Sequence, residues 1–296
     1  MQWHVFLPSD EKPRVTLTQD PKYSVMFPGE SVAFSCHVNV SFGWKYMWYK
    51  DGGQSIASGN NYSLNSVETT NRGSYACRAE RGSDPSFLTD SSQAIRLEVE
   101  GNKPKPLLTQ RPDVEKVYTG ELVSFQCKVE LSSGWRYHWY KDGTQLPINS
   151  SSFEIHDANL SNGGTYECKA IRDKTMYNTE HSYGRLLHVS EIPVPSLKLI
   201  TPWLDVFPTE SVKFSCGMDG TADWKYRWFK DKQPVQADST ASFGLDAATL
   251  SISSASAKHV GQYNCKGHLN DRSVGSNFSS GLTLNVYGEF SFLHFT

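Results

Sequence analysis

The sequence predicts an all-β protein built from three similar domains, and three observations carry this prediction. A Trp-x-Tyr-x-Trp motif occurs three times, beginning at Trp44, Trp135 and Trp224, so that the copies follow one another at intervals of 91 and 89 residues. Such a period is too long for a solenoid unit and suits one small domain per copy. Two cysteines recur at matching places in every copy, and apolar residues alternate with polar ones around the first of them.

The alternating segments predict strands. They consist of the following residues: Val32, Phe34, Cys36 and Val38; Val123, Phe125, Cys127 and Val129; Val212, Phe214, Cys216 and Met218. A period of two is typical of a strand that buries one face. The breaks between strands carry turn-forming pairs such as Pro28-Gly29 and Asp142-Gly143. No helical periodicity of useful length is present, so we expect β-structure throughout.

The cysteines belong to a recurring framework. In each copy a Trp stands 12 residues after the first Cys, and the second Cys ends a Tyr-x-Cys motif. This order is the signature of an immunoglobulin domain, in which a disulfide joins the two sheets and the Trp packs on it. We therefore predict three tandem immunoglobulin-like (C2-type) β-sandwich domains. The predicted disulfides are Cys36–Cys77, Cys127–Cys168 and Cys216–Cys265, and the predicted core residues are Trp48, Trp139, Trp228, Tyr75, Tyr166 and Tyr263.

The repeat also sets the domain boundaries, which we expect at residues 12–100, 104–190 and 195–287. Both linkers are short and contain two prolines each, so they are stiff and neighbouring domains should touch. The third span between cysteines is 49 residues long and the other two are 41. We expect the eight extra residues, around 234–250, to lengthen the edge-strand region of the third domain.

The cysteine pairs and the glycosylation sequons predict an extracellular protein. Three matched pairs of cysteines indicate structural disulfides and hence an oxidising compartment. Five sequons begin at Asn39, Asn61, Asn149, Asn159 and Asn277. No apolar stretch is long enough to span a bilayer, and the first residues do not form a secretory signal. We therefore expect an incomplete chain or a processed ectodomain that is secreted or held at the cell surface by a segment absent from this sequence.

Charge and motif content argue against several function classes. The chain has 29 Lys and Arg residues and 31 Asp and Glu residues, which gives a net charge of -2. This balance predicts no nucleic-acid partner and no attraction to anionic membranes. The sequence contains no nucleophile elbow, no phosphate-binding glycine loop and no zinc-protease motif, and all its cysteines are expected in disulfides. We expect no enzymatic activity, no cofactor and no metal.

The segments that differ between copies are the candidates for ligand binding. Loops at the ends of a sandwich are carried on a rigid frame and often hold the function. The loop after the second domain's second Cys is the richest in residue types favoured at interfaces, namely Arg172, Met176, Tyr177 and Tyr183. The alternative is an ordinary solvated hairpin. The Trp-x-Tyr-x-Trp motif recurs in every copy, so we interpret it as part of the core and not as a binding strip.

Several segments of the sequence resemble those of a known receptor family. The segments Pro-Gly-Glu-Ser-Val-Ala-Phe-Ser-Cys (28–36), Trp-Tyr-Lys-Asp-Gly and Asn-Gly-Gly-Thr-Tyr-Glu-Cys (162–168) are similar to those of leukocyte Fc receptors. They resemble most the Fc-receptor-like and leukocyte immune-type receptors of bony fishes, over residues 12–287. The resemblance implies a receptor of immune cells whose ligand is a protein such as immunoglobulin Fc or a class I histocompatibility molecule.

The chain departs from that family at two places. Thr201-Pro202-Trp203 resembles the hinge tryptophan that helps to clamp a proline of Fc, but the partner Trp is missing after Cys216. Trp203 is thus either a ligand contact or a residue packed between the second and third domains. Asn71, Asn162 and His259 stand where the family's corner motif has Asp, which removes one charge pair from each domain.

Two hypotheses of function follow. The first is the ligand-binding region of an Fc-receptor-like receptor that recognises a protein through domain-end loops and hinges. The alternative is a cell-adhesion molecule that acts through homophilic or heterophilic contacts of its immunoglobulin domains.

Overall fold

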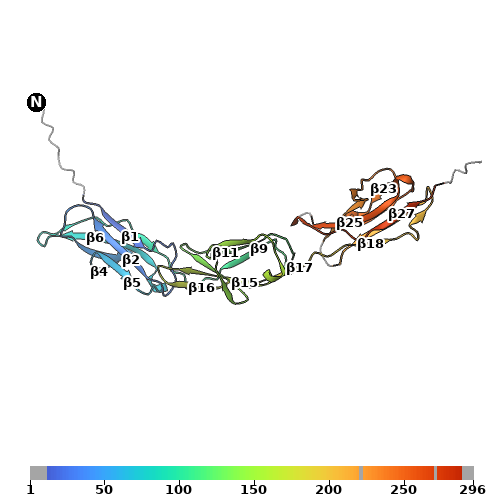
Figure 1. The fold of residues 1–296 in the computed structure, drawn as a ribbon. Helices are drawn as coiled ribbons and strands as arrows, with labels where there is room; N and C mark the ends of the chain where they lie inside the picture. Colours follow the sequence, from blue (N-terminus) through green and yellow to red (C-terminus); the bar gives the residue numbers. More distant parts are fainter. Residues whose placement is uncertain (1–11, 220–222, 270–271, 289–296) are drawn as a thin grey trace, which may run out of the picture. The chain divides into compact units, whose positions relative to one another are not determined.

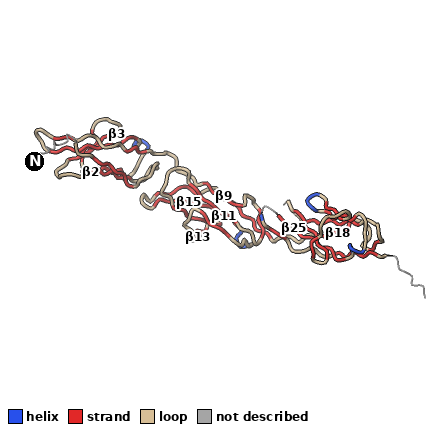
Figure 2. Tube along the Cα trace, turned by 90° about the horizontal axis from the view of Figure 1, so that it is seen from above, coloured by secondary structure: helices blue, strands red, loops and turns tan. Residues whose placement is uncertain are grey.

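The computed structural model describes residues 12–219, 223–269 and 272–288, and it confirms the all-β prediction (Figures 1 and 2). The helical elements of these residues are short 3₁₀ turns, namely η1 (Thr69–Asn71), η2 (Leu160–Asn162), η3 (Leu245–Ala247) and η4 (Ala257–His259). The chain divides into two compact units, one of residues 1–109, 125–153 and 165–185, the other of residues 110–124, 154–164 and 186–296. The division falls within the second domain, and each unit is described by itself.

The first domain is a two-sheet sandwich within the first unit. One sheet has the order β1 (Val15–Asp20), β2 (Val32–Val38) and β5 (Asn61–Leu64). The other has the order β4 (Ser55–Ser58), β3 (Lys45–Lys50), β6 (Gly73–Arg81) and β7 (Phe87–Leu88), and β8 (Ile95–Leu97) also pairs with β6. The alternating burial along β2 agrees with the period of two in its sequence, because every second residue faces the other sheet.

The second domain contributes strands to both units. In the first unit, β12 (Arg136–Lys141) pairs antiparallel with β13 (Thr144–Leu146) and with β15 (Gly164–Arg172), and β16 (Tyr177–His181) pairs with β15. In the second unit, β10 (Lys116–Tyr118) pairs in parallel with β17 (Arg185–Ser190). The remaining strands of this domain are β9 (Leu107–Arg111), β11 (Val123–Lys128) and β14 (Ser152–Ile155).

The third domain is a sandwich within the second unit. One sheet has the order β18 (Ser196–Leu199), β20 (Val212–Gly217), β24 (Thr249–Ile252) and β23 (Ala241–Phe243). The other has the order β19 (Asp205–Val206), β27 (Leu282–Val286), β25 (Gly261–Leu269), β21 (Lys225–Lys230) and β22 (Gln233–Pro234), and β26 (Val274–Gly275) pairs with β25. The extra residues around 234–250 include β23, which is the edge strand of its sheet.

Each domain has a core of the same composition around its disulfide. The structure joins Cys36 to Cys77, Cys127 to Cys168 and Cys216 to Cys265. The tryptophans at positions 48, 139 and 228 are buried, and each indole Nε1 donates a hydrogen bond to a loop carbonyl, at 2.7, 2.8 and 2.6 Å. A buried Phe stacks on the corner tyrosine, for example Phe34 on Tyr75 with ring centroids 4.9 Å apart. The indole nitrogen is thus satisfied while its ring fills the core.

The corner before the strand that carries the second Cys of each domain (β6, β15 and β25) keeps its hydrogen bond although it has no aspartate. In the first domain, Asn71 Oδ1 accepts from the Glu68 amide at 2.7 Å, and Asn162 does the same for Asn159 at 2.9 Å. In the third domain, His259 Nδ1 accepts from the Ser256 amide at 3.1 Å. A neutral acceptor therefore replaces the carboxylate, and the missing charge pair leaves the turn intact.

We predict that the stability of the third domain falls as the pH falls, through His259. Burial, aided by the nearby charge of Lys258, lowers the pKa of His259 below its ordinary value of 6.5, while Asp238 opposes the shift. The unfolded chain therefore takes up the proton first, and the folded state loses stability as the pH falls from about 7 towards 5. Calorimetric unfolding at both values checks this expectation.

The matched variant for this measurement is His259→Asn, which copies the acceptor of the other two domains. It should reduce the pH dependence while keeping the turn, and the part that remains comes from His268, whose pKa burial also lowers. His37→Asn is the control, because His37 is an exposed strand residue. Equal pH dependence in the wild type and in His259→Asn would refute the assignment.

Candidate functional site

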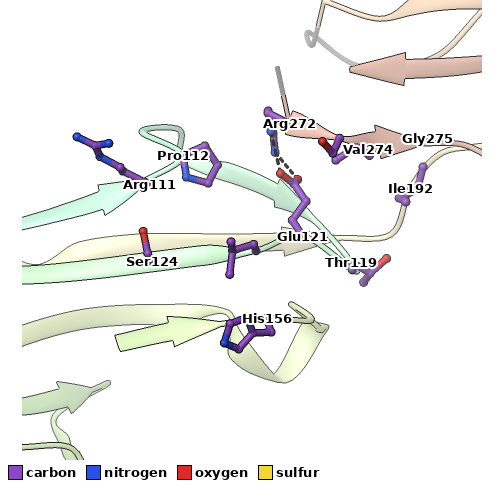
Figure 3. A pocket seen from close by; sticks show the side chains of 13 residues that line it. Arg111, Pro112, Thr119, Glu121, Ser124, His156, Ile192, Arg272, Val274 and Gly275 are labelled. Carbon is purple, nitrogen blue, oxygen red and sulfur yellow. Dashed lines mark hydrogen bonds and ion pairs between the residues drawn. The ribbon is translucent and has the colours of Figure 1, made fainter. Parts of the chain in front are cut away.

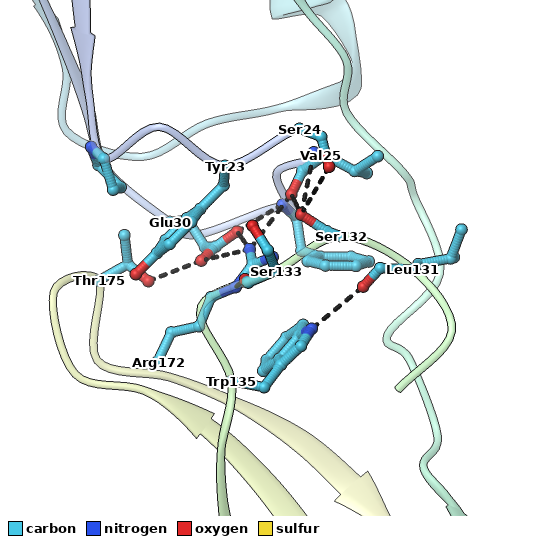
Figure 4. Close-up of polar contacts among 12 residues, drawn as sticks. Tyr23, Ser24, Val25, Glu30, Leu131, Ser132, Ser133, Trp135, Arg172 and Thr175 are labelled. Carbon is cyan, nitrogen blue, oxygen red and sulfur yellow. Dashed lines mark hydrogen bonds and ion pairs between the residues drawn. The ribbon is translucent and has the colours of Figure 1, made fainter. Parts of the chain in front are cut away.

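The first unit contains a joint between the first and second domains that is organised around Arg172 (Figure 4). Arg172 ends β15, where alternate residues point inward, and its side chain is 0% exposed. Its Nη1 donates to both carboxylate oxygens of Glu30, at 3.1 and 2.9 Å. Glu30 is also 0% exposed, so the two domains bury a complete ion pair between them.

The other groups of the joint satisfy most of this pair, although Arg172 Nη2 has no hydrogen-bond partner among the described residues. Arg172 Nε donates to the Ser133 carbonyl at 2.9 Å, and the Thr175 hydroxyl donates to Glu30 at 2.6 Å. The guanidinium lies between the rings of Tyr23 and Trp135, at 4.0 and 4.1 Å from their centroids. Burial lowers the pKa of Arg172, and the charge of Glu30 opposes this effect. Aromatic faces and a carboxylate together replace the water that the cation has lost.

Contacts at the border of the joint fix its register. The Ser132 hydroxyl donates to the Val25 carbonyl at 2.8 Å and accepts from the Val25 amide at 3.0 Å. Tyr177 stacks on Phe27 with ring centroids 5.3 Å apart, and burial raises the pKa of Tyr177 to about 12. Gly134 has a φ of 82°, and a Cβ there would lie 2.3 Å from the Tyr23 ring. A side chain at that position would therefore push the joint apart.

The second unit contains a joint of the same kind, between the second and third domains (Figure 3). Arg272 Nε donates to Glu121 at 2.9 Å, and Arg272 Nη2 donates to the same carboxylate and to the Lys116 carbonyl. Tyr118 and Trp224 pack with ring centroids 5.4 Å apart, and Leu269 and Val274 complete an apolar cluster. The acidic residue again comes from the earlier domain and the arginine from the later one, and each domain contributes an aromatic residue.

An open cleft of about 720 Å³ adjoins this second joint (Figure 3). Its lining includes Arg111, Leu122, His156 and the paired side chains of Glu121 and Arg272. The described residues contain no group of three or more His, Cys, Asp or Glu that could hold a metal ion. Among those same residues, no helix has the length and apolar character that crossing a membrane requires.

The head of the first domain is an exposed surface. We define the head of this domain as Val40, Ser41, Phe42, Trp44, Arg81, Phe87 and Leu88. The Phe42 side chain is 83% exposed, and the Arg81 guanidinium lies over both Phe42 and Trp44, 5.9 Å from each centroid. Arg81 Nη1 also donates to Ser41 Oγ at 2.5 Å. Trp44 packs edge-on against Phe87. An arginine and several aromatic rings thus face solvent together.

The structure separates the five residues that the sequence suggested as ligand contacts. Arg172 and Tyr177 lie together in the first joint, and the prediction that Arg172 contacts a ligand is wrong because its side chain is fully buried between the domains. Met176 is 82% exposed. Tyr183 is 79% exposed, with Lys105 Nζ 4.0 Å from its ring centroid.

Trp203 does not pack between the second and third domains. It is 67% exposed and directly precedes Leu204 and β19, which bond to the end of β27. The tryptophan in the second joint is Trp224 instead. Trp135 and Trp224 also correct the interpretation of the Trp-x-Tyr-x-Trp motif, because its first Trp packs between domains in two copies.

The sequence analysis missed the acidic half of the joints. Glu30, Glu121 and Glu210 recur at the repeat intervals of 91 and 89 residues, two positions before the strand that carries the first Cys of each domain (β2, β11 and β20). We had attributed recurring residues to the fold alone. The recurrence of an acidic residue that no immunoglobulin core requires was the available signal.

The sequons lie on the surface. Asn39, Asn61, Asn149, Asn159 and Asn277 are all exposed. Asn159 also caps η2, where its Oδ1 accepts from the Ser161 amide at 3.0 Å. All five positions are therefore accessible to modification in the part of the chain that the structure describes.

Comparison with known proteins agrees with this architecture. The sequence pattern of the immunoglobulin domain matches residues 12–93, 105–171 and 194–268. The chain belongs to the immunoglobulin superfamily. Among solved structures, three N-terminal domains of the highly immunogenic outer capsid protein of bacteriophage RB49 share this immunoglobulin-domain fold, with a TM-score of 0.61 and 13% identity over 93% of this chain and 99% of that chain.

Two relatives are much longer proteins. Human hemicentin-1 is 23% identical over 89% of this chain, and the human cell adhesion molecule DSCAML1 is 28% identical over 51% of it. This chain spans only 5% and 7% of those two proteins.

We predict that Arg172→Ala opens the first joint without unfolding the domains. The change leaves Glu30 buried without its charge partner, which costs about 3–5 kcal/mol. Hydrogen exchange at the Val25 amide, which bonds across the joint, should then speed up by about two orders of magnitude or more.

The control is Arg96→Ala, which removes an exposed ion pair between Arg96 and Glu98 within the first domain. It should leave the exchange of Val25 unchanged, because exposed pairs contribute little. Unaltered exchange in Arg172→Ala would show that the pair does not hold the joint closed.

Proposed function

We propose that this chain is an extracellular, non-catalytic binding segment of adhesion type, which recognises a protein through the head of its first domain. The observation that carries the proposal is a comparison of heads. In the second domain, Arg172 is fully buried against a protein neighbour, whereas its counterpart Arg81 is exposed beside the half-buried Trp44. The head of the second domain already binds a protein surface, that of the first domain, so the similar head of the first domain is suited to bind a protein as well.

The composition of the head supports this role. Aromatic residues and arginine are enriched at the energetic centres of protein interfaces. Phe42, Phe87 and Leu88 add exposed apolar area around Arg81. Single exposed apolar residues are common on any surface, whereas a cluster of them marks an interaction site. The three disulfides and the five exposed sequons favour an oxidising, extracellular location.

The relatives favour adhesion over other extracellular roles. One of them is itself named a cell adhesion molecule, and it matches half of this chain. Because this chain covers a small part of each relative, the role of the complete protein remains part of the proposal. Within it, the first domain presents its head to a partner.

The finer alternative is an Fc-receptor-like immune receptor whose ligand is immunoglobulin Fc or a class I histocompatibility molecule. The motif segments at 28–36 and 162–168 support it. It requires a ligand site that does not depend on a tryptophan clamp in the second joint, since Trp203 lies outside that joint.

We predict that Phe42→Ala combined with Phe87→Ala weakens ligand binding strongly. Loss of a central aromatic residue at an interface costs about 2 kcal/mol, which is roughly a 30-fold loss of affinity. Aggregation of beads coated with the chain tests adhesion, and biolayer interferometry against purified immunoglobulin and class I molecules tests the receptor alternative.

Leu245→Ala is the matched control, because Leu245 is an exposed apolar residue of the third domain. Aggregation that the double variant abolishes and the control preserves supports adhesion through the head. Binding to immunoglobulin or class I with no aggregation supports the receptor. Binding that the double variant leaves unchanged would overturn the assignment of the head.

A further inference from the structure

Both joints of the chain are built from the same two halves. The earlier domain supplies a base, which consists of an aromatic residue and, three positions later, a glutamate: Phe27 and Glu30 in one joint, Tyr118 and Glu121 in the other. The later domain supplies a head with a tryptophan and an arginine. Two independent joints with one chemistry define a rule for how these domains dock.

The base has the same conformation in all three domains. The backbone amide of the aromatic residue donates to the glutamate carboxylate at 2.8 Å in the first domain, 2.5 Å in the second and 2.7 Å in the third. The amide of the glutamate returns a bond to the carbonyl of the aromatic residue at 3.1, 3.2 and 3.2 Å. The third base, formed by Phe207 and Glu210, is therefore preorganised as the other two are.

The third base is exposed. Glu210 faces solvent and forms no ion pair among the described residues, and Phe207 is 64% exposed. Trp203 occupies the position that Tyr23 has in the first domain, where the Tyr23 ring covers the guanidinium of Arg172. Tyr287 is exposed beside Phe207, with ring centroids 6.5 Å apart. The third base thus offers an exposed carboxylate together with exposed aromatic residues.

The first domain carries the matching head. Ser41 and Ser132 share a positive φ, of 62° and 69°, in the loop before the tryptophan. Trp44 Nε1 donates to the Val40 carbonyl at 2.9 Å, and Trp135 makes the equivalent bond at 3.1 Å. Arg81 stands 91 residues before Arg172, at the same place on its strand. The head of the first domain is therefore held in the conformation that docks in the second.

We infer that the base of the third domain binds the head of the first domain of a second copy of this chain. Arg81 of one copy pairs with Glu210 of the other, and Trp203 and Trp44 cover the guanidinium. The charges and rings are complementary, as they are in the two joints within the chain. This inference rests on the proposed function and deepens it, because it names the partner of the exposed head.

The contact has a defined geometry of assembly. It joins two different surfaces, so a pair of copies held by one contact still has one free head and one free base. Association therefore grows with concentration, into rings if the rotation closes and into open chains if it does not. A single contact is weaker than a joint within the chain, since no linker raises the local concentration of its partner.

Sedimentation velocity over a wide range of protein concentration tests the inference. The oxidised wild-type chain should associate, and Arg81→Glu and Glu210→Arg should each weaken association by about tenfold or more, since each leaves like charges opposed. A mixture of the two variants should associate again, because each brings the partner that the other lacks. Arg227→Glu and Glu154→Arg are matched controls at exposed strand positions and should behave as the wild type.

A second variant covers the case in which Glu210→Arg disturbs the fold through loss of the bond to Phe207. Trp203→Ala leaves that bond intact, and it should also weaken association. A chain that stays monomeric at every concentration, or a mixture of charge variants that fails to associate, would overturn the inference. Loss of self-association together with head-dependent binding to another protein would overturn only this inference and leave the proposed function standing.

Discussion

The buried pair of Arg172 and Glu30 is the interaction on which the first unit depends. Two charges withdrawn from water are costly unless every donor and acceptor finds a place. The surrounding residues meet most of this constraint: Tyr23 and Trp135 cover the guanidinium, and the Thr175 hydroxyl donates to the carboxylate. Arg172 Nη2 alone has no hydrogen-bond partner among the described residues, and it is the donor left without compensation. A nonpolar joint of the same area would tolerate sliding, whereas a pair with fixed hydrogen-bond directions admits a single arrangement. The ion pair therefore contributes specificity of docking more than it contributes stability.

The glutamate of the base has two tasks that are separable in chemistry. It closes its own turn by accepting from the backbone, and it receives an arginine from the next domain. The first task is local and recurs in all three domains. The ion pair with the next domain requires an arginine within reach but not at a fixed position in the sequence. Arg172 ends a long strand, whereas Arg272 follows one. The glutamate acceptor keeps its position in the repeat while the arginine donor does not, and this explains how two joints of different sequence form the same ion pair.

The fold could be predicted from the sequence because its determinants recur. The cysteine spacing, the Trp of the core and the alternation along strands such as 32–38 depend on neighbours in the chain or on a disulfide that the repeat reveals. The joints could be predicted only in part. Arg172 was selected for its residue type, yet its burial depends on which end of one domain meets which end of another, and no local pattern encodes that. Packing of Trp203 between the second and third domains is wrong for the same reason, because that alternative took no account of the register of β19 with β27.

The closed turn of the base also bears on how the protein is made. Synthesis runs from the first residue, so Glu30 is folded into its domain long before Arg172 exists. A Glu30 carboxylate without a hydrogen-bond partner could pair with a wrong group while the domain is being synthesised. Here it is already held by the Phe27 amide of its own turn. The early domain is consequently complete when it leaves the ribosome, and the arrival of the second domain adds a bond to an acceptor that is already in position. The domains can therefore fold in the order in which they are made.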